Sequence, residues 1–179
     1  ILMSNELITI ELAKKGDAAA FRQLLDQHYR MMYRVAYRFT GQAHDAEDIA
    51  QEVCVGLTHK LKSFNGKSSF STWLYRVVVN SCRDYQKKHS THRKLESNYI
   101  DIEKNEQSDK NDSDKKLKWL YRTISTFEQS LKETALLVLT EELSHAEAGK
   151  ILGCAESTIS WRMHEIRKHL KNAIGSYHE

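Results

Sequence analysis

The sequence contains no proline and only 7 glycines among its 179 residues. Sandwiches and barrels use these two residues in their many tight turns, so their scarcity excludes an all-β fold and favours helices. No apolar run approaches the roughly 18 residues that cross a bilayer, and we therefore expect no membrane insertion. The 3 cysteines are odd in number, far apart and without C-x-x-C spacing. They do not form a disulfide framework, which favours a reducing cytoplasm.

Charge is distributed unevenly along the chain, although the formal net charge is only +3. Residues 65–95 hold 7 basic and 1 acidic side chains, a local net charge of +6. Residues 96–116 hold 4 basic and 7 acidic side chains, a local net charge of -3. A concentrated basic stretch in a nearly neutral protein indicates a surface that binds a polyanion. From composition alone, a solvated helix face explains the same stretch equally well.

Apolar residues recur at steps of three and four in residues 19–40 and again from Asp45 to about residue 61, which is the spacing of one helix face. The polar face of the second predicted helix is acidic. After a break at residues 64–66, Ser71 can cap a third helix that extends into the basic stretch. We expect these helices to share a core and to form a first domain at residues 5–95.

Residues 96–116 are rich in Asp, Asn, Ser, Glu, Gln and Lys and poor in apolar side chains. Such a segment cannot bury enough surface to offset its conformational entropy, so it is predicted to be a flexible linker. Helical periodicity resumes at Leu117, and a capping box of Ser130 and Glu133 is predicted to open an apolar helix. The predicted fold is therefore all-α, with a second small helical domain at residues 117–175.

Two further helices separated by a tight turn are predicted towards the carboxyl end. Ser144 and Glu147 form a second capping box, and Gly153 suits the left-handed position that closes a short helix. Another helix begins only a few residues later, around residues 156–158. Two helices joined by a tight glycine-containing turn predict a helix-turn-helix, a motif that enters the major groove of duplex DNA.

Residues 64–80 combine aromatic side chains, small polar groups and cations in one loop and helix start. Aromatic faces stack on unpaired bases, hydroxyl and amide groups bond to base edges, and cations hold phosphates. The segment therefore predicts a site for unstacked bases. In the alternative interpretation the aromatic residues belong to the core and the rest is a solvated turn; these residues are Phe64, Phe70, Trp73 and Tyr75.

Two segments resemble parts of a known family. Residues 45–53, DAEDIAQEV, followed by residues 64–80, FNGKSSFSTWLYRVVVN, closely resemble conserved regions two-point-two and two-point-three of the extracytoplasmic-function (ECF, group four) sigma factors of bacterial RNA polymerase. Residues 143–164 are similar to the region-four helix-turn-helix of the same class. The resemblance covers residues 10–88 and 117–172, and a variable linker between them is also a feature of the family.

The resemblance implies an alternative sigma factor that binds core RNA polymerase, directs it to specific promoters and melts the minus-ten element. Its acidic helix face would dock on the β′ clamp coiled coil, since an acidic surface attracts basic helices. The β flap is a second expected contact. The matching acidic-face positions are Asp45, Asp48, Gln51 and Glu52. Charge alone would favour a solvated helix face at these positions.

The resemblance also assigns residues to two promoter elements. A pocket for flipped bases of the non-template strand in the minus-ten element would use Phe64, Lys67, Ser68, Thr72, Trp73, Arg76, Asn80 and Arg83. Contacts to the duplex minus-thirty-five element would come from Ser157, Ser160, Trp161, Arg162, Arg167 and Lys168. Arg162 is expected to reach a base edge, and Arg167 and Lys168 are expected to hold phosphates. The alternatives are that both tryptophans only pack and that the last two cations are ordinary surface charges.

Catalysis and metal binding are not expected. The sequence has no Gly-rich phosphate loop, nucleophile elbow or supported carboxylate pair, so the chain is predicted not to be an enzyme and to use no cofactor. The best local metal cluster is Cys82, His89 and His92, but three candidate ligands without a fourth favour an ordinary polar surface over zinc. The chief rival function is a stand-alone helix-turn-helix regulator, which would bind duplex DNA without polymerase.

The resemblance implies further expectations about partners and location. An anti-sigma protein would control the chain in the bacterial cytoplasm and can hold it at the membrane. The sequence departs from the family where it lacks a proline before region four, has Ala155 where a capping serine is common and has Glu165 at an often basic position. These departures predict weaker DNA affinity, and they leave the promoter sequence and regulon open.

Overall fold

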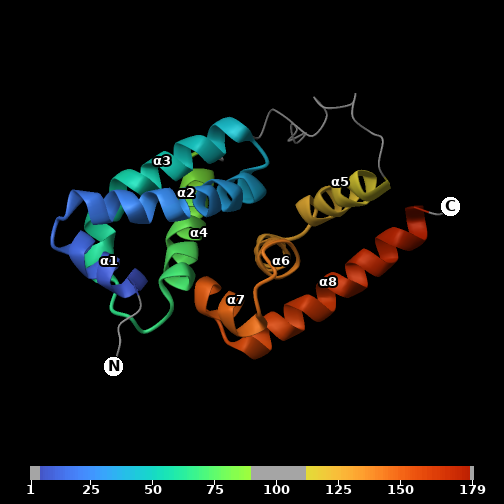
Figure 1. Ribbon diagram of the computed structural model, residues 1–179. Helices are drawn as coiled ribbons and strands as arrows, with labels where there is room; N and C mark the ends of the chain where they lie inside the picture. The colour runs from blue at the N-terminus through green and yellow to red at the C-terminus, as the bar shows by residue number, and fades with distance from the viewer. Residues whose placement is uncertain (1–4, 90–111, 178–179) are drawn as a thin grey trace. The chain divides into compact units, whose positions relative to one another are not determined.

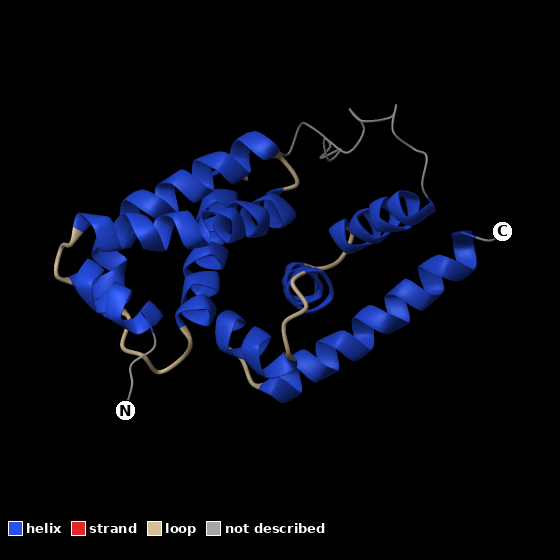
Figure 2. Ribbon diagram, in the orientation of Figure 1, coloured by secondary structure: helices blue, strands red, loops and turns tan. Residues whose placement is uncertain are grey.

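The computed structural model describes residues 5–89 and 112–177, and every regular element in these two ranges is a helix (Figure 2). The prediction of an all-α fold is confirmed. The chain divides into two compact units, Ile1–Ser97 and Asn98–Glu179. Each unit has its own buried core, so each is described separately below.

In the described part of the first unit, residues 5–89, there are four α-helices and one short 3-10 helix (Figure 1). Helix α2 packs against α1, α3 and α4, and α4 also packs across α3. The apolar faces predicted from periodicity in residues 19–61 supply much of this core. The elements are α1 (Asn5–Lys14), α2 (Ala18–Thr40), α3 (Ala43–Lys60), η1 (Leu61–Ser63) and α4 (Phe70–His89). The largest fully buried side chains are those of Ile10, Leu24, Met32, Ile49, Leu57, Leu61 and Leu74.

Helix α1 has no counterpart among the helices predicted from the sequence. Its apolar residues do not form one stripe, because Ile10 is buried whereas Leu7, Ile8 and Leu12 are exposed. A periodic pattern is therefore absent, and contacts with other elements, mainly α2 and η1, hold this helix in place.

Helix α4 begins at Phe70, and its cap differs from the predicted one. The backbone N–H of Thr72 donates to the Ser69 hydroxyl oxygen at 3.1 Å, and the backbone N–H of Trp73 donates to the Ser69 carbonyl at 3.1 Å. The prediction of Ser71 as the cap is therefore wrong. Ser71 already lies in the first helical turn, where its side chain cannot satisfy these two donors.

The second unit is built around α8, which packs against α6 and α7. Its elements are α5 (Asp112–Ser125), α6 (Gln129–Ala135), a π-helical turn η4 (Leu136–Thr140), α7 (His145–Leu152) and α8 (Glu156–Tyr177). Its fully buried side chains include those of Ile124, Leu136, Leu137, Ile151 and Ile159. Helix α5 covers residues 112–116, which were predicted to end the linker, whereas residues 96–111 of that linker lie outside the described residues.

The two predicted capping boxes have different outcomes. At α7 the Ser144 hydroxyl accepts from the Glu147 backbone N–H, and the Glu147 carboxylate accepts from the Ser144 backbone N–H, so this box is confirmed. The box of Ser130 and Glu133 is wrong. Helix α6 begins at Gln129, and the buried Glu133 carboxylate accepts from the Gln129 side-chain amide at 2.9 Å instead.

Candidate nucleic-acid interface

The loop before α4 is anchored by a cluster of three aromatic rings. Phe64 packs edge-on against Phe70 with ring centroids 5.5 Å apart, and its ring lies 5.5 Å from that of Trp73. Phe70 and Trp73 stack at 5.6 Å. Phe64 is only 4% exposed and Phe70 is also buried, whereas Trp73 remains half-buried. Trp73 is therefore the ring of this cluster that can offer a face to a base.

The polar residues predicted for the same site lie along one exposed face of α4. Thr72, Arg76 and Asn80 are four residues apart and Arg83 follows three residues later, so they share this face. The Arg83 guanidinium donates to the Asn80 side-chain oxygen at 3.3 Å, and the Thr72 hydroxyl bonds to that of Ser69 at 2.8 Å. We call Thr72, Arg76, Asn80 and Arg83 the α4 ridge.

Residues 64–69 bring two further predicted site residues next to the α4 ridge. Lys67 is exposed and Ser68 is half-buried. Gly66 has a φ of 73°, a left-handed conformation that turns the chain and that favours glycine. The Asn65 side-chain oxygen accepts from the Lys67 backbone N–H at 3.1 Å, which stabilises this turn locally. The loop therefore presents a cation and a hydroxyl beside the half-buried Trp73.

On α3 the predicted acidic face includes three exposed side chains, those of Asp48, Gln51 and Glu52. Asp48 pairs with the His44 ring nitrogen at 3.1 Å. Asp45 differs, since it is only 8% exposed and accepts a hydrogen bond from the Tyr85 hydroxyl at 2.8 Å. Burial, with a smaller contribution from the Asp48 charge, raises the pKa of Tyr85 and keeps this donor protonated. Asp45 therefore joins α3 to α4 inside the unit.

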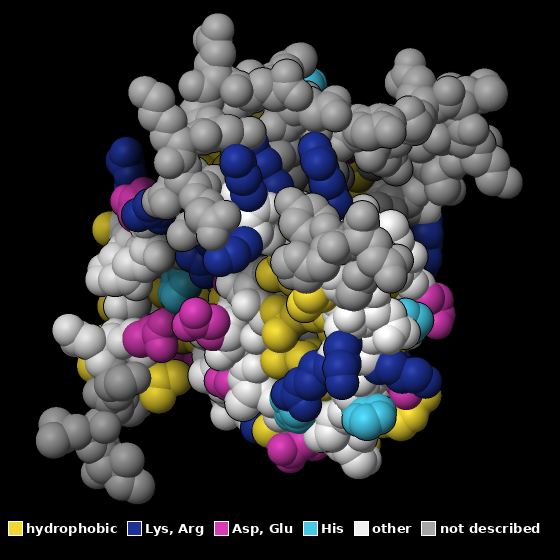
Figure 3. Space-filling model, turned by 90° about the vertical axis from the view of Figure 1, so that its right-hand side faces the viewer, with side chains coloured by type: hydrophobic (Ala, Val, Ile, Leu, Met, Phe, Trp, Pro, Cys, Tyr) yellow, Lys and Arg dark blue, Asp and Glu magenta, His cyan; other side chains and the backbone are white. Residues whose placement is uncertain are grey.

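Helices α7 and α8 form a helix-turn-helix in which α8 presents an exposed face. Ser157, Trp161 and Lys168 lie on this face, and Trp161 is 61% exposed. Ser160 and Arg167 lie at its edges and are also exposed. Figure 3 shows Lys, Arg and His side chains gathered in the lower part of the face that it displays.

The turn of this helix-turn-helix is tightly packed. The Gly149 carbonyl accepts from the backbone N–H groups of Gly153 at 2.9 Å and Cys154 at 3.0 Å, and Gly153 has a φ of 73°, as the sequence predicts. The His145 Nδ1 bonds to the Ser160 hydroxyl at 2.9 Å and joins the two helices. Arg162 is half-buried on the flank of α8, where its guanidinium lies 3.9 Å from the Cys154 sulfur. It therefore does not share the exposed face of Trp161.

Comparison with known proteins shows which family this chain is similar to. The Sigma-70 region 2 family model matches residues 24–92. The chain is 28% identical over 176 residues to the ECF RNA polymerase sigma factor SigW of Bacillus subtilis, covering 92% of this chain and 94% of that protein. It is 26% identical over 188 residues to the ECF RNA polymerase sigma-E factor of Escherichia coli, with coverage of 96% and 97%. Over nearly its whole length the chain is therefore similar to ECF sigma factors, and residues 24–92 match sigma-70 region 2.

Solved structures show the same fold as this chain. One is CnrH in complex with the cytosolic domain of CnrY, with a TM-score of 0.69 and 22% identity, covering 94% of this chain and 96% of that chain. Another is the sigma factor RpoE in complex with the anti-sigma factor NepR from Bartonella quintana, with a TM-score of 0.66, 20% identity and coverage of 87% and 96%. At these identities the likeness concerns the arrangement of helices alone.

Two exposed residues that adjoin the predicted sites were not predicted as site residues. Val55 is 76% exposed and follows Gln51 and Glu52 by four and three residues on α3, so it extends their face. His164 is exposed and lies one turn from Ser160 and Trp161 on α8. Helical spacing from the predicted residues would have identified both, but a valine and a histidine carry little functional signal by themselves.

The candidate metal cluster predicted from the sequence gains no support from the described residues. Cys82 is buried, and the His89 ring stacks on Tyr85 at 4.0 Å while its Nδ1 bonds to the Tyr85 carbonyl at 2.8 Å. His92 lies outside the described residues. Within residues 5–89 and 112–177, no three His, Cys, Asp or Glu side chains lie close enough to hold a metal ion. None of the helices in these ranges is both long and apolar enough to span a membrane.

Proposed function

We propose that this chain is a sigma factor that binds core RNA polymerase, directs it to specific promoters and opens the duplex at the minus-ten element with its first unit. The observation that carries this proposal is the α4 ridge beside the half-buried Trp73. It combines amide, hydroxyl and guanidinium groups with an aromatic face, which is the chemistry that holds an unstacked base and its phosphates.

The minus-ten site consists of the α4 ridge together with Lys67, Ser68 and Trp73. Extruding a base costs a few kcal/mol, and stacking on an aromatic ring returns roughly 1 to 3 kcal/mol. Trp73 supplies that ring, and the ridge cations hold the backbone. Phe64 was also predicted as a member, but its own ring is buried. Its role in this proposal is to pack against Trp73 and hold that ring in place.

In the second unit, α8 inserts its exposed face into the major groove of the minus-thirty-five element. Ser157, Ser160 and Trp161 face the base edges, and Arg167 and Lys168 hold phosphates. The half-buried position of Arg162 favours a phosphate at the groove edge over a base for this side chain. His164 joins the set as an exposed donor on the same face.

The surface of α3 that contacts polymerase consists of Asp48, Gln51, Glu52 and Val55. Two carboxylates attract a basic helical partner, and the exposed Val55 adds apolar surface at the end of this face that lies nearer the carboxyl terminus of α3. We assign this surface to the β′ clamp coiled coil and the second unit to the β flap. Asp45 is omitted from the contact because its carboxylate is committed to Tyr85.

An anti-sigma protein is a further proposed partner. CnrH and RpoE, two proteins of the same fold, were each solved with a partner, and the partner of RpoE is named as an anti-sigma factor. We assign this sigma factor to the bacterial cytoplasm, where such a partner holds it inactive, including at the membrane when the partner itself is anchored there.

Run-off transcription on genomic fragments tests the proposal, with purified core polymerase and the full chain. The wild type should give discrete transcripts only when both are present, and the double variant Trp73→Ala with Asn80→Ala should bind core normally but fail to open the promoter. Gln23→Ala, an exposed change on α2, serves as the control. Tight, specific binding of duplex DNA by the chain without core polymerase would instead favour the stand-alone regulator.

A further inference from the structure

Helix α1 holds the start of the minus-ten loop through one lysine. The Lys14 ammonium donates to the Phe64 carbonyl oxygen at 2.7 Å, although the two residues are 50 positions apart in the chain. The same ammonium bonds to the Glu11 carboxylate at 2.7 Å and lies 5.4 Å above the centre of the Phe64 ring. The side chain of Lys14 is only 20% exposed. Its charge is therefore directed into the unit.

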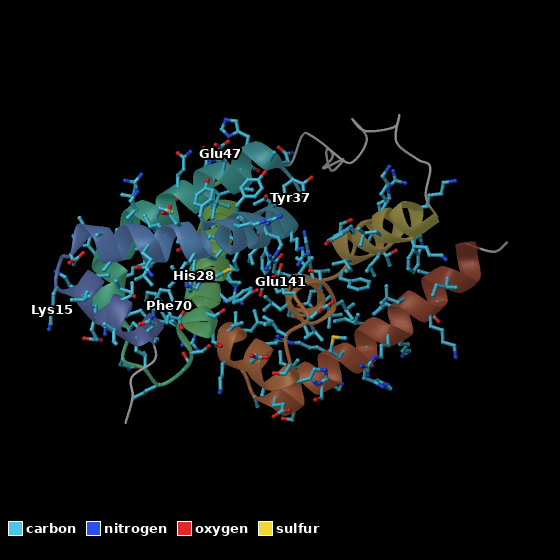
Figure 4. The ribbon with its side chains drawn as sticks, in the orientation of Figure 1. Lys15, His28, Tyr37, Glu47, Phe70 and Glu141 are labelled. Carbon is cyan, nitrogen blue, oxygen red and sulfur yellow. The ribbon has the colours of Figure 1, made fainter. Side chains whose placement is uncertain are left out.

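A second contact of α1 acts indirectly, through His28 of α2, on the other end of the same loop. His28 of α2 lies between Glu6 and the aromatic cluster, with its Nε2 3.4 Å from the Glu6 carboxylate oxygen and without hydrogen-bond geometry. Its ring packs edge-on against Phe70 at 5.1 Å, and Figure 4 shows the two side chains next to each other. Lys14 of α1 thus contacts Phe64 directly, whereas Phe70 is contacted by His28 of α2, which in turn lies against Glu6 of α1.

The loop between these two anchors has little regular structure of its own. Residues 65–68 lie outside the helices, and they are held locally by a bond from the Lys67 N–H to the Asn65 side chain and one from the Ser68 hydroxyl to the Ser69 carbonyl. The position of the loop therefore depends on how its ends are held. Holding a loop in its binding conformation lowers the entropy lost on binding and raises affinity without any new contact.

We propose that Lys14 is a positioning residue for promoter opening, which acts by fixing the Phe64 carbonyl and, through the Phe64 ring, the Trp73 face. This inference rests on the proposed minus-ten function of the loop. Lys14 itself does not touch DNA, because its ammonium is bonded to Phe64 and Glu11. The salt slope is the change in the logarithm of DNA affinity with the logarithm of salt concentration. A positioning role predicts weaker binding of the opened strand with an unchanged salt slope, whereas loss of a phosphate contact would lower the magnitude of this slope by about one.

Holoenzyme made from core polymerase and the full chain tests this on two forms of one promoter obtained by the run-off assay. One form is fully paired, and the other has a mismatched, pre-opened minus-ten segment. Lys14→Met should reduce affinity for the pre-opened form about fivefold, which corresponds to one net hydrogen bond, and should slow opening of the paired form by a similar factor. Lys14→Arg, which keeps the charge and donors, should restore most of both.

Lys15→Met is the matched control at the residue directly after α1. Lys15 is exposed, and in Figure 4 its side chain extends away from the unit, so this variant removes the same charge without touching the loop. It should behave as the wild type. Equal losses in Lys15→Met and Lys14→Met, or a reduced salt slope in Lys14→Met, would overturn the positioning role in favour of a general charge effect or a phosphate contact.

Hydrogen exchange on the free full chain separates positioning from unfolding. Lys14→Met should speed exchange of the backbone N–H groups of Phe64 and Lys67 while the amides in the middle of α2 and α3 exchange at wild-type rates. If Lys14→Met changed neither the exchange of the loop amides nor the DNA affinity, the positioning role of Lys14 would be refuted while the proposed minus-ten function would stand. A wild-type holoenzyme that neither binds the pre-opened strand nor opens the duplex would refute the proposed function beneath it.

Discussion

Alanine substitution at two glycines inside helices should change the free energy of unfolding in opposite directions. Replacing a helix-interior glycine by alanine gains about 1 kcal/mol of helix propensity at either position. A Cβ on Gly56 in α3 would meet only the flexible Lys60 side chain, 3.7 Å away, so the gain should appear nearly in full. A Cβ on Gly149 in α7 would lie 2.8 Å from the Cys154 carbonyl oxygen, which is backbone of the helix-turn-helix turn.

The Gly149 contact must therefore force the turn to move. Overpacking of this kind costs about 1 to 3 kcal/mol, which offsets or exceeds the propensity gain. Gly56→Ala should raise the free energy of unfolding by about 0.5 to 1 kcal/mol. Gly149→Ala should lower it by up to about 2 kcal/mol, the difference between the two effects. Because the turn sets the position of α8, this variant should also weaken binding to the minus-thirty-five duplex.

Native-state hydrogen exchange measures both effects separately, because the two glycines lie in different units. Peptides from α3 should become more protected in Gly56→Ala, and peptides from α7 and the start of α8 less protected in Gly149→Ala. If Gly149→Ala increased protection as much as Gly56→Ala does, the close approach of α7 to its turn would be refuted. Holoenzyme affinity for the minus-thirty-five duplex provides the functional measurement, with Gly56→Ala as its control.

The remaining predictions concern two hydrogen-bonded carboxylates. Ser144→Ala removes the α7 cap and should cost about 1 kcal/mol in urea unfolding; a cost as small as that of an exposed helix substitution would contradict it. Hydrogen bonds from Ser144 lower the pKa of Glu147, so this group stabilises the folded state above its ordinary pKa and loses that effect as the pH falls through the lowered value. The urea midpoint of the wild type should therefore fall between neutral and acidic pH, and the midpoint of Ser144→Ala should fall by less. An equal fall in both proteins would count against the stabilising role of the Glu147 carboxylate. Tyr85→Phe removes one donor from buried Asp45 and should cost about 1 to 3 kcal/mol, whereas an unchanged urea midpoint would show that this bond contributes nothing.

The features predicted correctly from the sequence are those whose partners lie nearby in the chain. The Ser144 and Glu147 box needs only three residues of separation, and the left-handed Gly153 follows from the end of α7. The apolar faces of α2 and α3 depend on steps of three and four. In each case the local sequence contains both members of the interaction, so pattern reasoning is sufficient.

The features that local sequence patterns did not determine share a different cause. Asp45 and Asp48 look alike on a helical projection, but Asp45 is bonded to Tyr85, 40 residues away. Phe64 looks like a stacking residue, but its burial depends on the neighbouring rings and on Lys14, 50 residues before it. Ser69 and Ser71 are both suitable caps, and the placement of Phe70 in the core decides between them. Such outcomes depend on tertiary contacts, which periodicity and capping rules do not contain.

Long-range hydrogen bonds, which local sequence patterns do not predict, connect the two proposed surfaces of the first unit, the α4 ridge and the exposed face of α3. The Tyr85 hydroxyl ties α4 to Asp45 of α3, and the Gln86 side-chain amide ties α4 to the Phe39 carbonyl of α2 at 3.2 Å. Asp48 and Gln51 lie one and two turns beyond Asp45 on α3, and the α4 ridge ends two residues before Tyr85. In the complex proposed above, a polymerase helix docked on α3 would be connected to the ridge through these hydrogen bonds between helices.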